Sequence, residues 1–191
     1  MKRKNSIHAI LVVLVLGISG NAEAQSGKEL VTPFRKGSAT INLGVGFGRN
    51  YKGDFERGNA FGSKAAFEYG IWKAGPGVVS LGAEVGTSFS NHGFNDKYND
   101  FRGSTIIGAI RSAWHYGWNV SRLDTYAGIS TGIGFHHRDY NYGASHFKTN
   151  EINPAFGGFV GASYYLSPSV GFNVEAGYDI TSVQAGVVFK L

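Results

Sequence analysis

The sequence lacks cysteine and has few prolines and few charged residues. With no Cys, disulfides and thiolate metal sites are excluded. Only 4 Pro accompany 29 Gly in 191 residues, which argues against a disordered linker protein. Charged residues make up 16% of the chain, below the roughly 25% usual for soluble domains, while aromatic residues reach 14%. Many glycines and aromatics at strand spacing favour an all-β protein with close packing.

The chain also lacks a long apolar run and a sustained helical period. Its N-terminus has basic residues at 2–4, a short apolar core over 10–16, and small residues at Ala22 and Ala24. This pattern predicts a cleavable secretory signal peptide over residues 1–24. The apolar core is too short to be a membrane-spanning helix, which needs about 20 residues.

The charge balance of the remaining chain is close to neutral. The whole sequence has 18 Lys and Arg against 13 Asp and Glu, and residues 1–24 contain three of the former and Glu23. Their removal leaves 15 basic against 12 acidic residues, a surplus too small to indicate nucleic-acid binding. Residues 25–35 are expected to form a short periplasmic lead, and residues 36–191 the folded domain.

Eight runs of alternating apolar and polar residues follow one another along this domain. In each run one face is apolar and the other carries Gly, Ser, Thr or charged side chains, as in a half-buried strand. The runs are 38–48, 61–71, 78–89, 104–116, 123–136, 154–166, 169–178 and 182–191.

The first six connections between these runs alternate in length, whereas the seventh, near Asp179, departs from the rule and is short. Those at 49–58, 90–101 and 137–150 are long and polar, whereas those at 73–77, 117–122 and 167–169 are short. An even number of strands with alternating short and long connections predicts an eight-stranded antiparallel up-and-down transmembrane β-barrel. Lipid offers no hydrogen bonds, so a sheet in a membrane must close on itself. A soluble β-sandwich or lipocalin-like barrel also alternates, but it does not place aromatics at strand ends and charges in mid-strand.

The signal sequence, the eight runs and the ending "AGVVFKL" resemble the small eight-stranded outer-membrane barrels of the OmpA/OmpX type, the outer membrane protein β-barrel domain family. The resemblance covers residues 36–191 and implies a monomer in the cell outer membrane, in contact with outer-membrane lipid and lipopolysaccharide. It also implies that the barrel-assembly machinery reads the final strand through Val187, Phe189 and Leu191. Many members end in Phe itself, whereas here Phe189 is followed by two further residues.

The polar faces of the runs predict what fills the lumen. The mid-strand charges that should point inward are Lys64, Glu68, Glu84, Arg111 and Glu175, with His115 and Asp124 nearby. Eight strands leave a lumen that side chains can just fill, and buried charges must be paired. Adjacent strands should let Glu84 meet Lys64 or Glu68 and also reach Arg111, while Glu175 could join across the lumen. The lumen is therefore expected to hold a charged network that acts as a plug.

These patterns favour a structural or surface-interaction role over two alternatives. The alternatives are a narrow channel for small solutes and an outer-membrane enzyme that modifies lipid A. The cluster His136, His137, Asp139 and His146 fits no specific metal spacing, and the pairs Ser90 with His92 and Ser145 with His146 lack the deacylase His-x-Ser pattern. We therefore assign no catalytic residue, metal ligand or cofactor.

Overall fold

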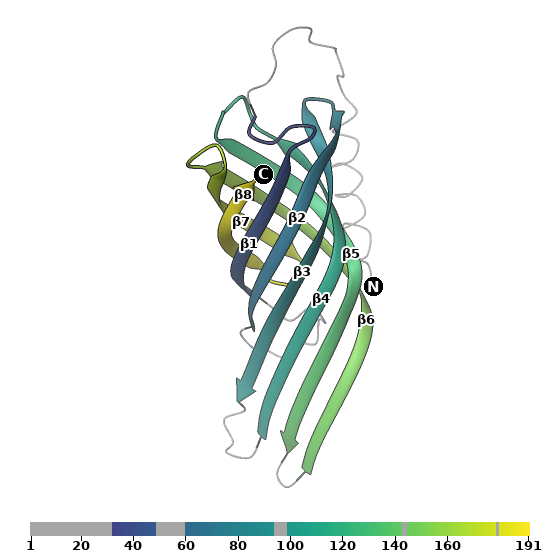
Figure 1. Ribbon diagram of the computed structural model, residues 1–191. Coiled ribbons are helices and arrows are strands. Elements are labelled where there is room, and N and C mark those ends of the chain that lie inside the picture. The colour runs from purple at the N-terminus through teal and green to yellow at the C-terminus, as the bar shows by residue number, and fades with distance from the viewer. Residues whose placement is uncertain (1–31, 49–59, 94–98, 143–144, 179) are drawn as a thin grey trace, which may run out of the picture.

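The computed structural model describes residues 32–48, 60–93, 99–142, 145–178 and 180–191. They form eight antiparallel strands in a closed barrel (Figure 1). The strands are β1 (Ala39–Gly48), β2 (Ala60–Ala74), β3 (Gly77–Gly93), β4 (Asn99–Tyr116), β5 (Leu123–Tyr142), β6 (Ser145–Tyr165), β7 (Val170–Tyr178) and β8 (Val183–Lys190). The all-β, eight-stranded prediction is confirmed.

The strands pair in chain order, and β8 returns to pair with β1. This closing seam runs from Thr40 opposite Lys190 to Phe47 opposite Val183. Because both edges of the sheet are used, the ring leaves no open edge at the level of the seam. Among the described residues there is no helix of the length and apolarity needed to cross a bilayer.

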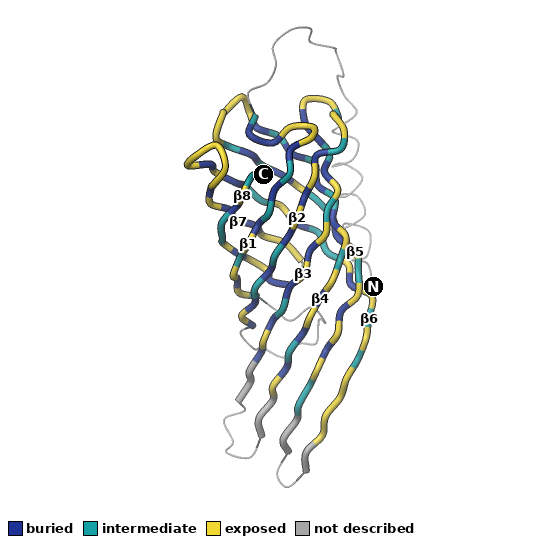
Figure 2. The backbone as a smooth tube through the Cα atoms, in the orientation of Figure 1, coloured by how far each residue is buried: buried dark blue, intermediate teal, exposed yellow. Residues whose placement is uncertain are grey.

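Alternate residues of each strand face opposite sides of the barrel wall, as predicted. The apolar set lies outside: Ile129 is 71% exposed and Val85 55%. Their polar neighbours point inward and are buried, so Figure 2 shows exposed and buried residues alternating along each strand. A closed ring with an apolar exterior and a polar interior is the architecture of an outer-membrane β-barrel.

One strand breaks the alternation. The β2–β3 ladder pairs Gly70 with Ser80 and then Trp72 with Val79, so Ile71 is an extra, bulged residue. The sequence pattern placed Ile71 on the apolar outer face. Because a bulge shifts the facing of later residues by one position, Trp72 takes the exposed position instead, at 54%.

Four of the strands continue well beyond the barrel rim. β3, β4, β5 and β6 extend together at the lower end of Figure 1, past the ends of β1, β2, β7 and β8. The regions 90–101 and 137–150 were predicted to be long loops. This prediction is wrong, because β3 continues to Gly93, β4 begins at Asn99, β5 continues to Tyr142 and β6 begins at Ser145. The sequences of these segments are rich in polar residues and have no regular apolar period to reveal a strand. The connection at 49–58 lies outside the described residues.

The opposite end holds the short connections and the C-terminus (Figure 1). The β4–β5 connection turns at Trp118 and Asn119, whose φ angles are 51° and 58°, and Val120 N donates to Gly117 O at 2.8 Å. Outside the wall here, Trp114 stacks on Tyr116 and Tyr116 meets Trp118 edge-on. Such aromatics are typical of a membrane–water interface.

Candidate functional site

The centre of the lumen is built around one arginine. Arg111, on β4, is 1% exposed and reaches carboxylates on three other strands. Its Nε donates to Glu68 Oε1 at 3.1 Å, its Nη1 to Glu84 Oε2 at 2.9 Å and its Nη2 to Glu175 Oε2 at 2.9 Å. One planar guanidinium therefore ties β2, β3, β4 and β7 together across the barrel.

A second cation completes this central network. Lys64 Nζ donates to Glu175 Oε1 and lies 3.5 Å from Glu84 Oε2. The structure thus brings together all five charged residues that the sequence analysis assigned to the lumen: Lys64, Glu68, Glu84, Arg111 and Glu175. Glu175, on β7, contacts both cations and spans the lumen rather than joining at its margin.

Uncharged residues that the sequence analysis did not single out support the network. The ring of Phe159 lies 3.9 Å from Arg111 Cζ, in a cation–π contact. Tyr126 Oη donates to Glu175 Oε2 at 3.0 Å and accepts from Asn173 Nδ2 at 2.7 Å. Only their inward position in the alternation of each strand could have indicated this role. Aromatic side chains are not expected in a polar lumen, so the sequence offered no other reason to select Phe159 and Tyr126.

A glycine makes the central contact possible. Gly82 on β3 lies directly between Glu68 on β2 and Arg111 on β4 in the strand register. A Cβ at this position would lie 1.8 Å from Phe67 O, so no other residue fits without moving the backbone. The absence of a side chain there leaves room for Arg111 to cross β3 and reach Glu68.

Next to the network, three residues form a Ser–His–Asp chain. His115 Nδ1 lies 2.9 Å from Asp124 Oδ2, and His115 Nε2 lies 3.1 Å from Ser80 Oγ. This is the connectivity of a hydrolytic triad. However, Ser80 is 0% exposed, and its hydroxyl also lies 3.3 Å from Glu68 Oε1 and from Ala113 O. A nucleophile must reach its substrate, so this buried chain is suited to holding β3, β4 and β5 together.

The N-terminal lead closes one end of the lumen. Phe34 is 2% exposed, and its ring stacks on His115 with centroids 3.9 Å apart. Lys190 Nζ donates to Pro33 O at 2.6 Å and fastens the lead to the last strand. Phe34, which the sequence analysis included in the periplasmic lead, enters the mouth of the barrel.

The β7–β8 connection fills the other end. Ile180 is 1% exposed and packs with Ile107 and Ala155. Thr181 is 5% exposed, and its Oγ1 donates to Gln184 Oε1 at 3.4 Å. With Phe34 at one end, the Arg111 network in the middle and Ile180 at the other end, the described side chains occupy the lumen at three levels.

The remaining candidate residues are not gathered into a site. His136 points inward beside Thr105, 3.0 Å from its Oγ1, whereas His137 is exposed and lies 2.7 Å from Asn150 Oδ1. Consecutive strand residues face opposite ways, so these two histidines cannot share a ligand. Ser90 is buried, and the side chains of His92, Ser145 and His146 lie outside the described residues.

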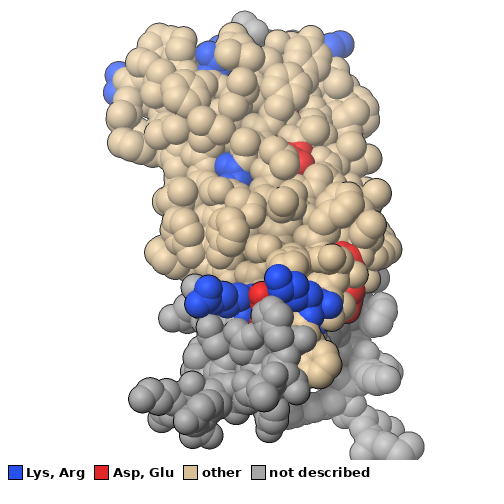
Figure 3. Space-filling model, turned by 60° about the horizontal axis from the view of Figure 1, so that its bottom comes forward, with Lys and Arg blue, Asp and Glu red and all other residues tan. Residues whose placement is uncertain are grey.

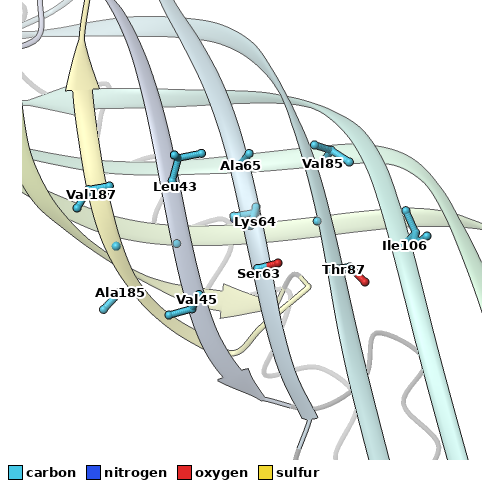
Figure 4. Close-up of a pocket in the computed structure, with 13 residues that line it drawn as sticks. Leu43, Val45, Ser63, Lys64, Ala65, Val85, Thr87, Ile106, Ala185 and Val187 are labelled. Carbon is cyan, nitrogen blue, oxygen red and sulfur yellow. The ribbon is translucent and has the colours of Figure 1, made fainter.

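The outer wall carries a shallow apolar depression of about 650 Å³ across β8, β1, β2, β3 and β4 (Figure 4). Leu43, Val45, Val85, Ile106 and Val187 stand around small residues such as Ala65 and Ala185. It lies on the lipid-facing side, where acyl chains fill irregularities of the wall.

Of the three residues assigned to the assembly signal, Val187 and Phe189 lie in the β8–β1 seam opposite Leu43 and Ile41. Leu191 follows it, with its N donating to Ala39 O at 2.9 Å.

No family model and no curated protein matches the chain by sequence. Among solved structures, Ail, the attachment invasion locus protein of Yersinia pestis, is 12% identical, with 82% of this chain and 96% of that chain covered at a TM-score of 0.47. Neisserial surface protein A is 13% identical, with 82% and 98% covered at 0.49. The outer membrane protein OprG from Pseudomonas aeruginosa is 14% identical, with 84% and 99% covered at 0.47. These identities and TM-scores are too low to transfer a function to the chain.

Proposed function

We infer that the chain is a plugged, non-enzymatic outer-membrane barrel that presents its extended β3–β6 sheet as a contact surface outside the cell. The observation that carries this proposal is the continuation of these four strands past the barrel rim. A barrel that only sealed the membrane would need short connections at both ends. Here the longest strands, β5 with 20 residues and β6 with 21, build a rigid projection instead.

The edge of this projection has the geometry for contact. β6 pairs with β5 from Tyr164 down to Ser145, but with β7 only over Gly158–Tyr165. From Ser145 to Gly157 its other edge has no neighbouring strand within the described part of the chain. Such an edge presents main-chain donors and acceptors to which an extended segment of another protein can add. Phe147 and Ile152, which are 61% and 69% exposed, add apolar area.

The same projection carries charged side chains of both signs. Figure 3 shows a wall nearly free of charged side chains and a band of Lys and Arg at its border with the residues drawn grey. Arg102, Asp139 and Lys148 lie in direct register across β4, β5 and β6, with alternating sign. This mixed surface suits a protein or glycan partner, or the lipopolysaccharide around the barrel.

The filled lumen supports the proposal against the two alternatives. A channel would need a continuous path past Arg111, which is 1% exposed, and an enzyme would need access to Ser80, which is 0% exposed. The barrel is proposed to be a monomer that is assembled through β8 by the barrel-assembly machinery.

The proposal is tested by shortening the β5–β6 hairpin. Residues 138–149 are replaced by Asn-Gly, which joins His137 to Asn150 through a two-residue turn. Cells displaying the parent and the shortened variant are compared for binding to a panel of extracellular proteins and glycans. We expect both to assemble and only the parent to bind. Equal binding by both, or no binding above cells without the barrel, contradicts the contact role; large, steady conductance of the parent in planar bilayers contradicts the plug.

A further inference from the structure

The end of the barrel that holds the C-terminus carries positive charge on its surface. Its exposed or half-buried ionic side chains, called here the basic rim, are Arg35, Lys36, Lys73, Arg122 and Lys190. The described carboxylates nearest this end, Glu68 and Asp124, are buried in the lumen. Apart from the terminal carboxylate at Leu191, no acidic group of the described residues lies on this surface. An excess of one sign around an opening attracts ligands of the other.

Three cations of the basic rim line a cavity of about 400 Å³, called here the mouth cavity. Arg35, Lys36 and Lys73 line it together with Phe34, Pro76, Val78 and His115. The cavity therefore joins an apolar floor to cationic walls. That combination suits a ligand with an anionic group attached to an apolar or glycerol body, rather than a bare ion.

The backbone that carries the two neighbouring cations, Arg35 and Lys36, is held in place before any ligand arrives. Residues 35–38 form a tight turn in which Ser38 N donates to Arg35 O at 2.9 Å and Arg35 N donates to Ser38 Oγ at 3.0 Å. Gly37 has a φ of 85°, as a type II turn requires at its third residue. Gly37 N also donates to Gly70 O at 2.8 Å, which attaches the turn to β2. Because Phe34 is sunk in the lumen, Lys36 projects from a fixed point.

The position of the mouth cavity along the barrel axis indicates that its anionic ligand is a membrane lipid. Trp72 precedes Lys73 directly and is 54% exposed, and Trp118 at the same end is 60% exposed. Exposed Trp side chains mark the membrane–water interface of a barrel. Lys73 and Lys36 therefore lie at the level of the lipid headgroups.

We propose that the mouth cavity binds the phosphate headgroup of an anionic phospholipid from the leaflet around the C-terminal end of the barrel. Lys36 and Lys73 contact the phosphate, and Phe34, Pro76 and Val78 contact the glycerol and the first acyl carbons. This site is separate from the extended sheet and does not depend on the function proposed above.

The test measures lipid preference with spin-labelled lipids in nanodiscs, which leave both faces accessible. The parent barrel is compared with Lys36→Gln/Lys73→Gln and with a matched control, Arg102→Gln/Lys148→Gln, which removes two charges from the extended sheet. Labelled phosphatidylglycerol and phosphatidylcholine report on association. We expect the parent to prefer phosphatidylglycerol, the first variant to lose this preference by about tenfold, and the control to retain it.

Other results overturn the proposal. They are an absence of preference in the parent, no loss in the first variant, or an equal loss in both variants, which would reflect total charge alone. A second arm adds inorganic phosphate to the parent in phosphatidylcholine nanodiscs that contain labelled phosphatidylglycerol, and follows the signal of the bound label. Displacement of labelled phosphatidylglycerol by inorganic phosphate at comparable concentration would assign the cavity to a soluble anion instead. Unchanged heat-modifiable migration of both variants on gels establishes that they fold.

Discussion

The ring of Phe34 lies flat against the imidazole of His115, with the two planes 15° apart. One residue belongs to the lead that precedes the first strand, and the other to the middle of the chain on β4. The contact joins the lead to the Ser80–His115–Asp124 chain and, through Ser80, to the carboxylate of Glu68. Phe34 is thus part of the packed interior.

Truncating Phe34 should therefore destabilise the barrel. We expect Phe34→Ala to lower the free energy of unfolding by about 3 kcal/mol, because a buried aromatic side chain is lost and a cavity remains. Phe34→Leu should lose less, since it keeps most of the apolar volume. Denaturant titration in lipid vesicles measures both, and equal stability of Phe34→Ala and the parent would show that the stack contributes nothing.

Removing Arg111 takes a cation from three carboxylates at once, and Lys64 remains beside only two of them, Glu84 and Glu175. Loss of one partner from a buried ion pair costs about 3–5 kcal/mol. We therefore expect Arg111→Ala to lower the free energy of unfolding by at least this amount. The double change Arg111→Met with Glu84→Leu should be less damaging, because it fills the space and removes one carboxylate. It leaves Glu68 without its cation, so recovery should be partial. A double variant less stable than Arg111→Ala would refute this order.

Because the apolar side chains face outward into the bilayer, a charged substitution on this face should be tolerated less the closer it lies to the bilayer midplane. Ile129→Arg, near the middle of the belt, should destabilise the barrel by about 2–4 kcal/mol, and Val85→Arg should behave alike. Leu166→Arg, next to the turn at the C-terminal end, should cost at most about 1 kcal/mol. Folding equilibria in vesicles test this, and equal effects at Ile129 and Leu166 would argue against a bilayer around the belt.

Two glycines offer a matched pair of substitutions. A Cβ on Gly82 would collide with Phe67 O, whereas a Cβ on Gly108 would meet nothing within 4 Å. We therefore expect Gly82→Ala to block formation of the compact form and Gly108→Ala to fold normally. Heat-modifiable migration on gels distinguishes the outcomes. Normal folding of Gly82→Ala would mean that the β2–β3 backbone can yield.

The last strand should be essential for closure. Deleting Val187–Leu191 removes the pairs that Val187, Phe189 and Lys190 make with β1, together with the buried Val188. We expect an unclosed chain that shows no heat-modifiable form and is degraded in the periplasm. A deletion variant that still migrates as a compact barrel would show that the barrel can close without these residues.

Much of the barrel could be predicted because the bilayer imposes a simple rule. Each strand needs one apolar face, so alternation alone located all eight strands and the facing of residues such as Ile129 and Glu84. The lumen charges followed from the same rule, because the inward positions are the polar ones.

Three features could not be predicted, each for a physical reason. The extended parts of β5 and β6 are solvated on both sides, so residues such as His137 and Asn150 carry no apolar period. The burial of Phe34 depends on an opening that exists only once the ring has closed. The contact of Arg111 with Glu175 crosses the lumen, so sequence order suggested that Glu175 could join the network but could not identify Arg111 as its partner.

The continuity of β5 and β6 has a mechanical consequence. Each strand runs without interruption from a short turn at one end of the barrel to the outer tip. From Phe135 to Tyr142 the backbone advances roughly 23 Å, at about 3.3 Å per residue. A pull on the tip along the strands would load the ladder hydrogen bonds between β5 and its neighbours in parallel shear, so that many must break together. Force on a partner bound at the tip would thus be shared by the hydrogen bonds along the full length of β5 and β6. The projection would bear tension without losing these bonds one after another.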